Sequence, residues 1–319
     1  RDLVRSRGLG DVYKRQNQQT YAAELQKDNY NGWYYENGQA YWYDNGVLAR
    51  SKEVYDPQTD AWYWFEADGT MARDKDVFIV LNADGTGKWT RYDSDGRMVK
   101  GESYKNGAWY YFDLTTGAMA KGFVNLPQSD DPNGKWVYYD PITGKMQYGE
   151  QYIDGYWYYF DVNGTMLTGW QKMANDRYYL YDTGEMAVGW AKINGQWYYF
   201  WPLTENGHTQ GTMAYGGWKI IGADYYFFRE DGSLYTGWLE QNGSWYYLNT
   251  LDNSLQGTMF TGWLIREGKT YFLDADGVMA TGWYQVDGNW YYFWPDSGEM
   301  AKNQYINGFY VNEDGIWYR

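Results

Sequence analysis

The sequence predicts an all-β protein, a solenoid of stacked β-hairpin repeats of about 20–27 residues each. Three observations lead to this prediction. Trp, Tyr and Phe make up 22% of the 319 residues while aliphatic residues are sparse, so aromatic rings must supply most of the buried area. Ten of the eleven methionines stand two residues after a glycine, and Asn-Gly or Asp-Gly pairs recur between short β-prone runs. Such pairs are the strongest short-range sign of a hairpin.

The Gly-x-Met slot marks each repeat. Successive slots lie 20 to 27 residues apart, which gives about twelve units from Gly32 onward and a partial last unit at 305–319. One hairpin alone is marginal in water, but stacked hairpins bury one another's faces and gain stability from their neighbours. The slots are filled by Leu48, Met71, Met98, Met119, Met146, Met166, Met186, Met213, Leu234, Met259, Met279 and Met300.

The hairpin turn fixes which rings share a face. With Asn194-Gly195 as a two-residue type I′ turn, Trp190 pairs with Tyr199, and residues two apart point the same way. Trp190, Trp197 and Tyr199 are therefore expected on one face, with Tyr198 on the other, where Phe200 joins it. The equivalent sets are Trp238, Trp245 and Tyr247, and Trp283, Trp290 and Tyr292.

Complete hairpins alternate with partial ones. Seven residues after three other Gly-Trp tryptophans, a different residue replaces the second Trp: Arg177 after Trp170, Tyr225 after Trp218 and Thr270 after Trp263. We therefore expect a site to be assembled from two hairpins, one giving two or three rings and its neighbour another. The first half is more degenerate, because Glu102, Phe123 and Glu150 replace the first Trp. We accordingly divide the repeats into 32–168 and 169–319.

The first sixteen residues do not belong to the repeat pattern. Residues 1–16 are basic, lack the recurrent aromatic motif and resemble translated sequencing-adapter read-through. We expect this segment to be non-native, with 17–31 as a linker, and we expect the natural N-terminus to be missing. No signal peptide pattern is present at the start of the chain.

Composition and motifs exclude several classes of function. The formal net charge of −14 disfavours nucleic acid and favours cationic partners. No stretch is long and apolar enough to span a membrane. The chain has no cysteine, and His208, its single histidine, is expected in a solvated loop, so a nucleophilic triad lacks its parts. Two motifs, 93–96 and 274–277, mimic part of a calcium loop but lack ligands at its ends, so we interpret them as turns. We expect no cofactor, no metal site and no catalytic residue.

The repeat resembles a known family. Gly189-Trp190, five or six residues with Asn194-Gly195, Trp197-Tyr198-Tyr199-Phe200 and then Gly-x-Met resemble the choline-binding, or cell-wall-binding, repeat of Gram-positive surface proteins. The resemblance implies ligand sites between successive hairpins, where a choline headgroup of teichoic acid lies among three aromatic rings and a methionine. It implies these candidate ligand-binding residues: Trp190, Trp197, Tyr199, Trp218, Trp238, Trp245, Tyr247, Trp263, Trp283, Trp290, Tyr292, Met186, Met213, Met259, Met279 and Met300.

The chemistry of a quaternary ammonium agrees with that implication. Such a cation has no N–H to donate, so aromatic faces hold it best, each contributing about 0.5–2 kcal/mol. The sequence therefore predicts a non-catalytic, extracellular, cell-wall-associated module that binds choline-bearing teichoic acids or another wall polysaccharide. The alternative is a glucan-binding repeat module of the kind found in glucosyltransferases and toxins, because aromatic platforms also stack on sugars. A further hypothesis is that the chain is the targeting module of a cell-wall hydrolase. The number of working sites and the oligomeric state stay open.

Overall fold

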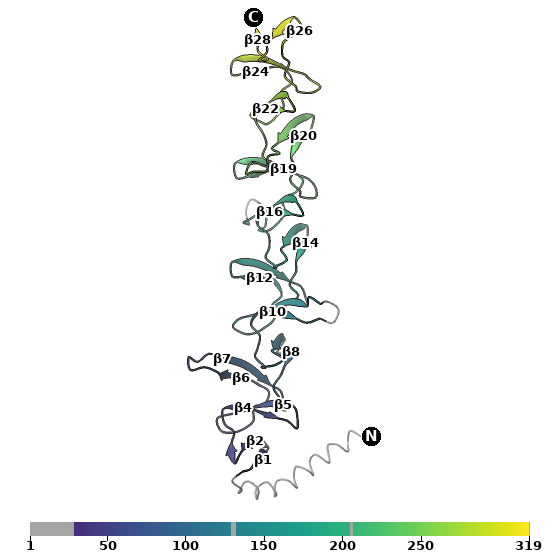
Figure 1. The fold of residues 1–319 in the computed structure, drawn as a ribbon. Helices are drawn as coiled ribbons and strands as arrows, with labels where there is room; N and C mark the ends of the chain where they lie inside the picture. The colour runs from purple at the N-terminus through teal and green to yellow at the C-terminus, as the bar shows by residue number, and fades with distance from the viewer. Residues whose placement is uncertain (1–28, 129–131, 205–206, 319) are drawn as a thin grey trace. The chain divides into compact units, whose positions relative to one another are not determined.

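The computed structural model describes residues 29–128, 132–204 and 207–318. Within these residues the chain forms eleven two-stranded sheets and two three-stranded sheets, joined by turns and without helices (Figure 1). The all-β hairpin prediction is confirmed. The predicted non-native segment at 1–16 and most of the linker at 17–31 lie outside the described residues.

The chain divides into two compact units, the first comprising 1–151 and 159–166 and the second comprising 152–158 and 167–319. The division predicted at residue 168 rests on repeat quality and stays a prediction. The strands that precede the division are β1 (Gly32–Glu36), β2 (Gln39–Asp44), β3 (Val47–Leu48), β4 (Lys52–Asp56), β5 (Ala61–Phe65), β6 (Lys75–Val80), β7 (Gly87–Tyr92), β8 (Gly101–Lys105), β9 (Ala108–Phe112), β10 (Gly122–Leu126) and β11 (Lys135–Tyr139).

The division falls within the hairpin of β12 (Gly149–Ile153) and β13 (Tyr156–Phe160). The strands that follow are β14 (Gly169–Met173), β15 (Asp176–Leu180), β16 (Gly189–Ile193), β17 (Gln196–Phe200), β18 (Gly217–Ile221), β19 (Asp224–Phe228), β20 (Gly237–Gln241), β21 (Ser244–Leu248), β22 (Gly262–Arg266), β23 (Lys269–Leu273), β24 (Gly282–Val286), β25 (Asn289–Phe293), β26 (Gln304–Ile306), β27 (Phe309–Val311) and β28 (Trp317–Tyr318).

The hairpin turns have the predicted chemistry. Asn194 and Gly195 have φ angles of 50° and 82°, and two consecutive positive values define the type I′ turn that Asn-Gly favours. This turn sets the predicted register, in which Trp190 pairs with Tyr199 and Lys192 with Trp197. The pairs Asn106-Gly107, Asp154-Gly155, Asn242-Gly243 and Asp287-Gly288 have the same two positive φ angles.

The Gly-x-Met slot joins each hairpin to the one before it. Met279 forms a β-bridge with Leu273, the last residue of its own hairpin. Its backbone N–H donates to the carbonyl of Trp245 in the preceding hairpin, at 2.8 Å. The same bond recurs along the chain from Met98 to Trp62, Met119 to Trp89, Met146 to Trp109, Met166 to Trp136, Met186 to Trp157, Met213 to Arg177, Leu234 to Trp197, Met259 to Tyr225 and Met300 to Thr270. These bonds link the hairpins into the predicted stack within each unit.

The glycine of the slot is needed for packing as well as for its backbone angle. Gly277 has φ +76°, and a Cβ there would lie 2.5 Å from the sulfur of Met259 in the preceding slot. Each slot side chain is therefore covered by the glycine of the next repeat. This close approach explains why Gly-x-Met is the most regular feature of the sequence.

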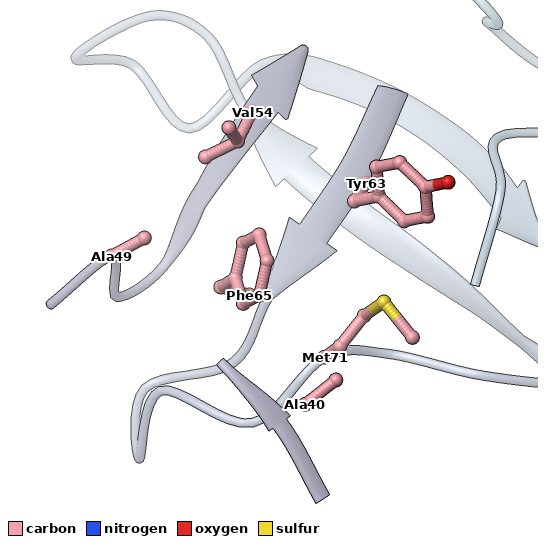
Figure 2. Packing of buried hydrophobic residues seen from close by; sticks show 6 residues of the cluster. All are labelled: Ala40, Ala49, Val54, Tyr63, Phe65 and Met71. Atoms are coloured by element: carbon pink, nitrogen blue, oxygen red, sulfur yellow. The ribbon is translucent and has the colours of Figure 1, made fainter. Parts of the chain in front are cut away.

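The core is distributed among the interfaces between hairpins. One cluster contains Ala187, Ala191, Ile193, Phe200 and Met213, and half-buried Tyr198 packs on it. In the first unit an equivalent cluster surrounds Phe65, which is fully buried (Figure 2). Aromatic rings and the slot methionines fill these clusters, so no single deep core is required.

Candidate functional site

The two faces of a hairpin meet different neighbours. Tyr199 belongs to a buried cluster with Tyr226 and Phe228 of the following hairpin, whereas Phe200 packs on the other side with Ala187. Trp190 contacts the following hairpin, where its ring centre lies 4.9 Å from that of Tyr226. Sites between hairpins therefore take rings from one face of a repeat and from the opposite face of the next repeat.

The first candidate site, which we call the central cage, lies between the β16–β17 and β18–β19 hairpins. Trp190 and Trp197 are perpendicular at 87° with their ring centres 6.5 Å apart. Tyr226 and Leu234 from the next repeat line the same cavity of about 210 Å³. Burial raises the pKa of the Tyr226 phenol, and the nearby Asp224 raises it further, so this ring stays neutral at physiological pH. Two indoles, a phenol and an aliphatic side chain make an apolar box without a charged lining residue.

A further wall of the central cage comes from a loop much later in the chain. Asn253, Ser254 and Gln256 line the cavity together with the two indoles. They belong to the insertion 250–257, which separates β21 from the slot at Met259. Three successive hairpins and their connecting turns therefore contribute to this cavity.

The second candidate site, the C-terminal cage, repeats the arrangement with aromatic residues alone. Trp283 and Trp290 take the positions of the two indoles, and Phe309 and Trp317 complete a cavity of about 270 Å³. Trp317 occupies the methionine slot, since it follows Gly315 by two residues and pairs with Val311.

A third cavity, the charged pocket, departs from the cage chemistry. It has a volume of about 360 Å³ and is lined by Trp170, Gln171, Lys172, Arg177, Tyr198 and Asp231. Arg177 stands where the second indole would be, and its guanidinium donates to the carbonyl of Glu230. Two cationic side chains make this pocket unsuitable for a quaternary ammonium.

The other predicted tryptophans follow the same geometry. Trp218, Trp238 and Trp263 each pack against the third residue of the next hairpin's second strand. Their ring-centre distances are 5.1 Å to Tyr246, 4.9 Å to Tyr271 and 4.8 Å to Tyr291. Trp245 is 44% exposed beside Trp238. Trp218 therefore faces the hairpin after its own and is not part of the central cage.

Several predicted site residues lie beneath the rings. Tyr199 and Tyr247 are 8% and 3% exposed, and Tyr292, half-buried, packs on Trp283 at 5.3 Å. Each of these tyrosines packs against the first Trp of its own hairpin and does not line a cage. The slot methionines lie against the next repeat's glycine: Met186 against Gly211, Met213 against Gly232, Met259 against Gly277, Met279 against Gly298 and Met300 against Gly315. Ligand contact by these tyrosines and methionines stays a prediction.

Sequence reasoning missed the residues that close the cages. Tyr226 and Phe309 lie on the hairpin face opposite the predicted rings, the face of Tyr198 and Phe200, where no ligand-binding residue was predicted. Strand alternation could have identified them, because the Gly-Trp tryptophan of each hairpin packs against this face of the following hairpin. Trp317 was signalled by its place in the Gly-x-Met slot. The insertion residues had no sequence signal that linked them to Trp190.

In the first unit, internal cations occupy the equivalent interfaces. Asp76 stands in the first-Trp position and binds Arg91 through two hydrogen bonds of 2.7 and 2.9 Å. The Arg91 guanidinium lies 4.3 Å from the ring centre of Tyr110 and 5.0 Å from that of Phe112. This interface is a cation–π contact supplied by the chain itself.

A second example lies one repeat earlier. Glu53, also in the first-Trp position, forms an ion pair of 2.9 Å with Lys88 and accepts a hydrogen bond from Tyr92. Glu102 is the third acidic replacement and lies 3.8 Å from Lys135. At these three positions the carboxylate pairs with an internal amine or guanidinium group, so the chain supplies its own cation where an acidic residue replaces the first Trp.

The remaining polar motifs show no catalytic arrangement. His208 lies in the insertion loop, as predicted, and is half-buried there because it stacks on Trp201 with ring centres 4.0 Å apart. The carboxylates of Asp93 and Asp274 each accept two backbone N–H bonds from their own turns, as turn chemistry requires. Among the described residues, no group of three acidic, His or Cys side chains could hold a metal ion. Within the same residues, no helix is long and apolar enough to cross a membrane.

Stacked hairpins with aromatic cavities between them define the chain as a hairpin-repeat protein. The pattern of the choline-binding repeat matches residues 84–122, 167–207, 215–255 and 256–305, more than half of the chain. The cell wall binding repeat matches 58–71 and 151–166. The chain therefore belongs to the choline-binding repeat family. None of the curated proteins matches it.

Solved structures of similar chains come from Streptococcus pneumoniae. CbpJ from strain TIGR4 is 26% identical with a TM-score of 0.51, and the match covers 90% of this chain and all of CbpJ. Choline-binding protein F, solved with a peptidoglycan analogue, is 26% identical with a TM-score of 0.51, over 91% of this chain and 99% of that protein. These similarities agree with the hairpin-repeat architecture.

Proposed function

We propose that this chain is a cell-wall anchoring module that binds the choline headgroups of teichoic acid in the aromatic cages between its hairpins. The observation that supports this most directly is the central cage, where two perpendicular indoles and a neutral phenol line one cavity. A quaternary ammonium finds there the ring faces it needs, and no charged side chain lines the cavity. The Lys192 ammonium lies 5.6 Å from the ring centre of Trp197, so a ligand would share that indole with it.

Cage size and chemistry are compatible with a small methylated cation. The cavities of about 210 and 270 Å³ are open to solvent on one side, where Trp190 and Trp290 are 36% and 40% exposed. Three ring contacts at about 0.5–2 kcal/mol each would give a weak single site. The net charge of −14 adds a general attraction for cations.

Repetition would convert weak sites into firm attachment. The central and C-terminal cages lie in one chain, and a polymer with repeated headgroups could occupy both at once. Linked binding events raise the overall affinity by about 10²–10⁴ when geometry allows both. This role is extracellular attachment to the wall and involves no catalysis by the repeats.

The proposal is tested by isothermal titration of the chain with choline. We expect saturable binding, followed by competition when choline is added to chain held on a resin that bears tertiary or quaternary amines. A folded chain that shows no saturable heat up to about tens of millimolar choline would contradict the proposal. Retention on dextran but not on the amine resin would instead support the glucan-binding alternative.

A further inference from the structure

The two cages differ in one wall. The C-terminal cage is closed by four aromatic side chains, whereas the central cage is closed by Asn253, Ser254 and Gln256 in addition to its rings. These three side chains are neutral and offer amide and hydroxyl groups that donate and accept hydrogen bonds. The central cage therefore presents a polar side to whatever projects from an ammonium bound by the indoles.

The polar wall is a built feature of the repeat. Ten residues lie between Leu248 and its slot partner Met259, compared with five between Leu273 and Met279. The inserted backbone is held by hydrogen bonds from the N–H of Gly257 to Asn249 and of Thr258 to Leu255. The Asn253 carboxamide oxygen accepts the N–H of Leu255, which leaves its amide nitrogen available as a donor.

A second insertion shows how such a loop reaches an earlier indole. The insertion before Met213 ends in the same four residues, Gln210-Gly211-Thr212-Met213, as the one before Met259. The side-chain oxygen of Gln210 accepts a hydrogen bond of 3.2 Å from the indole N–H of Trp157, which lies two hairpins earlier. Gln256 has the equivalent place relative to the central cage, and the indole N–H of Trp197 is buried without a partner.

We infer that the insertion 250–257 is a specificity wall, which makes the central cage select a quaternary ammonium that carries an oxygen-bearing arm. The indoles and Tyr226 hold the methylated nitrogen, and the Asn253, Ser254 and Gln256 side chains hydrogen-bond the hydroxyl or phosphoryl oxygens of the arm. The C-terminal cage binds the ammonium without regard to that arm. This inference rests on the proposed function. It adds the residues that hydrogen-bond the oxygen-bearing arm of the ligand.

The test compares three probes at each cage separately. Tetramethylammonium has the ammonium alone, choline adds a hydroxyl arm and phosphocholine adds a phosphoryl arm. In chain labelled with 5-fluorotryptophan, the ¹⁹F resonances of Trp197 and Trp290 are assigned by single Trp→Phe substitutions and report each cage. We expect an arm-bearing probe to bind at Trp197 about threefold or more tightly than tetramethylammonium, the effect of one net hydrogen bond. At Trp290 the probes should bind within about twofold of one another.

The matched variant is N253A/S254A/Q256A. It should reduce the preference at Trp197 to the level at Trp290. Unchanged affinities of all three probes at Trp290, together with an unchanged circular dichroism spectrum, show that the variant is still folded. An equal preference at both cages, or a preference at Trp197 that survives the triple substitution, would overturn the inference alone. If no probe gives a saturable shift at either tryptophan, the proposed function fails and the inference fails with it.

Discussion

The ring centres of Trp190 and Tyr226 lie 4.9 Å apart across the boundary between two repeats. Neither hairpin contains both rings, so the cavity they line exists only when the hairpins are stacked. Folding and ligand recognition thus depend on the same interface. A ligand that fills it should stabilise the stack by mass action as well as bind to it.

The contribution of the cage indoles can be measured against a matched indole. Trp290 and Trp89 occupy the same hairpin position and are 40% and 41% exposed, but Arg91 and Asp76 fill the interface beside Trp89. We expect Trp290→Ala to weaken choline binding at the C-terminal cage by about 3–30-fold, which corresponds to 0.5–2 kcal/mol. Trp89→Ala should leave titration of choline unchanged. Similar losses in both variants would argue against the cage.

The buried ion pair of the first unit should be structurally costly to break. The Arg91 side chain is 5% exposed and depends on Asp76 for two hydrogen bonds. Because Asp76→Ala leaves a buried guanidinium unpaired, we expect a loss of about 3 kcal/mol in the free energy of unfolding in urea. Asp95→Ala, in an exposed turn, should change it by less than about 0.5 kcal/mol. Equal effects of the two substitutions would refute the structural role of the pair.

The slot glycines should tolerate alanine less well than the hairpin-turn glycines. Gly288 has φ +82° with open space around it, so Gly288→Ala should cost only the left-handed strain of about 1–2 kcal/mol. Gly277→Ala adds a clash with Met259 and should cost about 1–3 kcal/mol more. Urea unfolding measures both, and Met259→Ala combined with Gly277→Ala should recover part of the added loss. If the clash is unimportant, the two glycine variants will be equally stable.

Alkaline pH should destabilise the stack. Burial raises the pKa of Tyr198 and of Tyr226 above the ordinary value of 10.0, with Asp231 and Asp224 adding to the shift. The folded state therefore keeps protons that the unfolded chain loses. The stabilisation is complete below about pH 10 and is lost as the pH rises through the raised pKa values. Circular dichroism and tyrosinate absorbance between about pH 8 and pH 12 should show unfolding together with delayed titration. Tyrosines that all titrate near pH 10 in a folded chain would disagree with this picture.

Local sequence rules were sufficient for the hairpins. Asn194-Gly195 fixed the turn, the turn fixed the pairing of Trp190 with Tyr199, and the observed register agrees at every pair of that hairpin. The position of the first two cage rings followed from that register. These features depend on turn geometry and strand alternation, which are properties of neighbouring residues.

The closing walls of the cages depend on contacts between repeats and could be predicted only in part. Tyr226 lies on the hairpin face where no ligand-binding residue was predicted, but this face also forms a wall of the cage for the tryptophans of the preceding hairpin. Gln256 lies 59 residues after Trp197 in the chain, and no periodicity relates an insertion to an earlier cage. The buried positions of Tyr199 and Tyr247 likewise follow from stacking and not from strand alternation alone.

The most direct test of the account is a crystal structure of the chain grown with saturating choline. We expect electron density for the trimethylammonium group inside the central cage, in contact with the faces of Trp190, Trp197 and Tyr226, and for a second group between Trp283 and Trp290. Choline bound elsewhere on the chain, with both cages empty and their indoles unmoved, would contradict it.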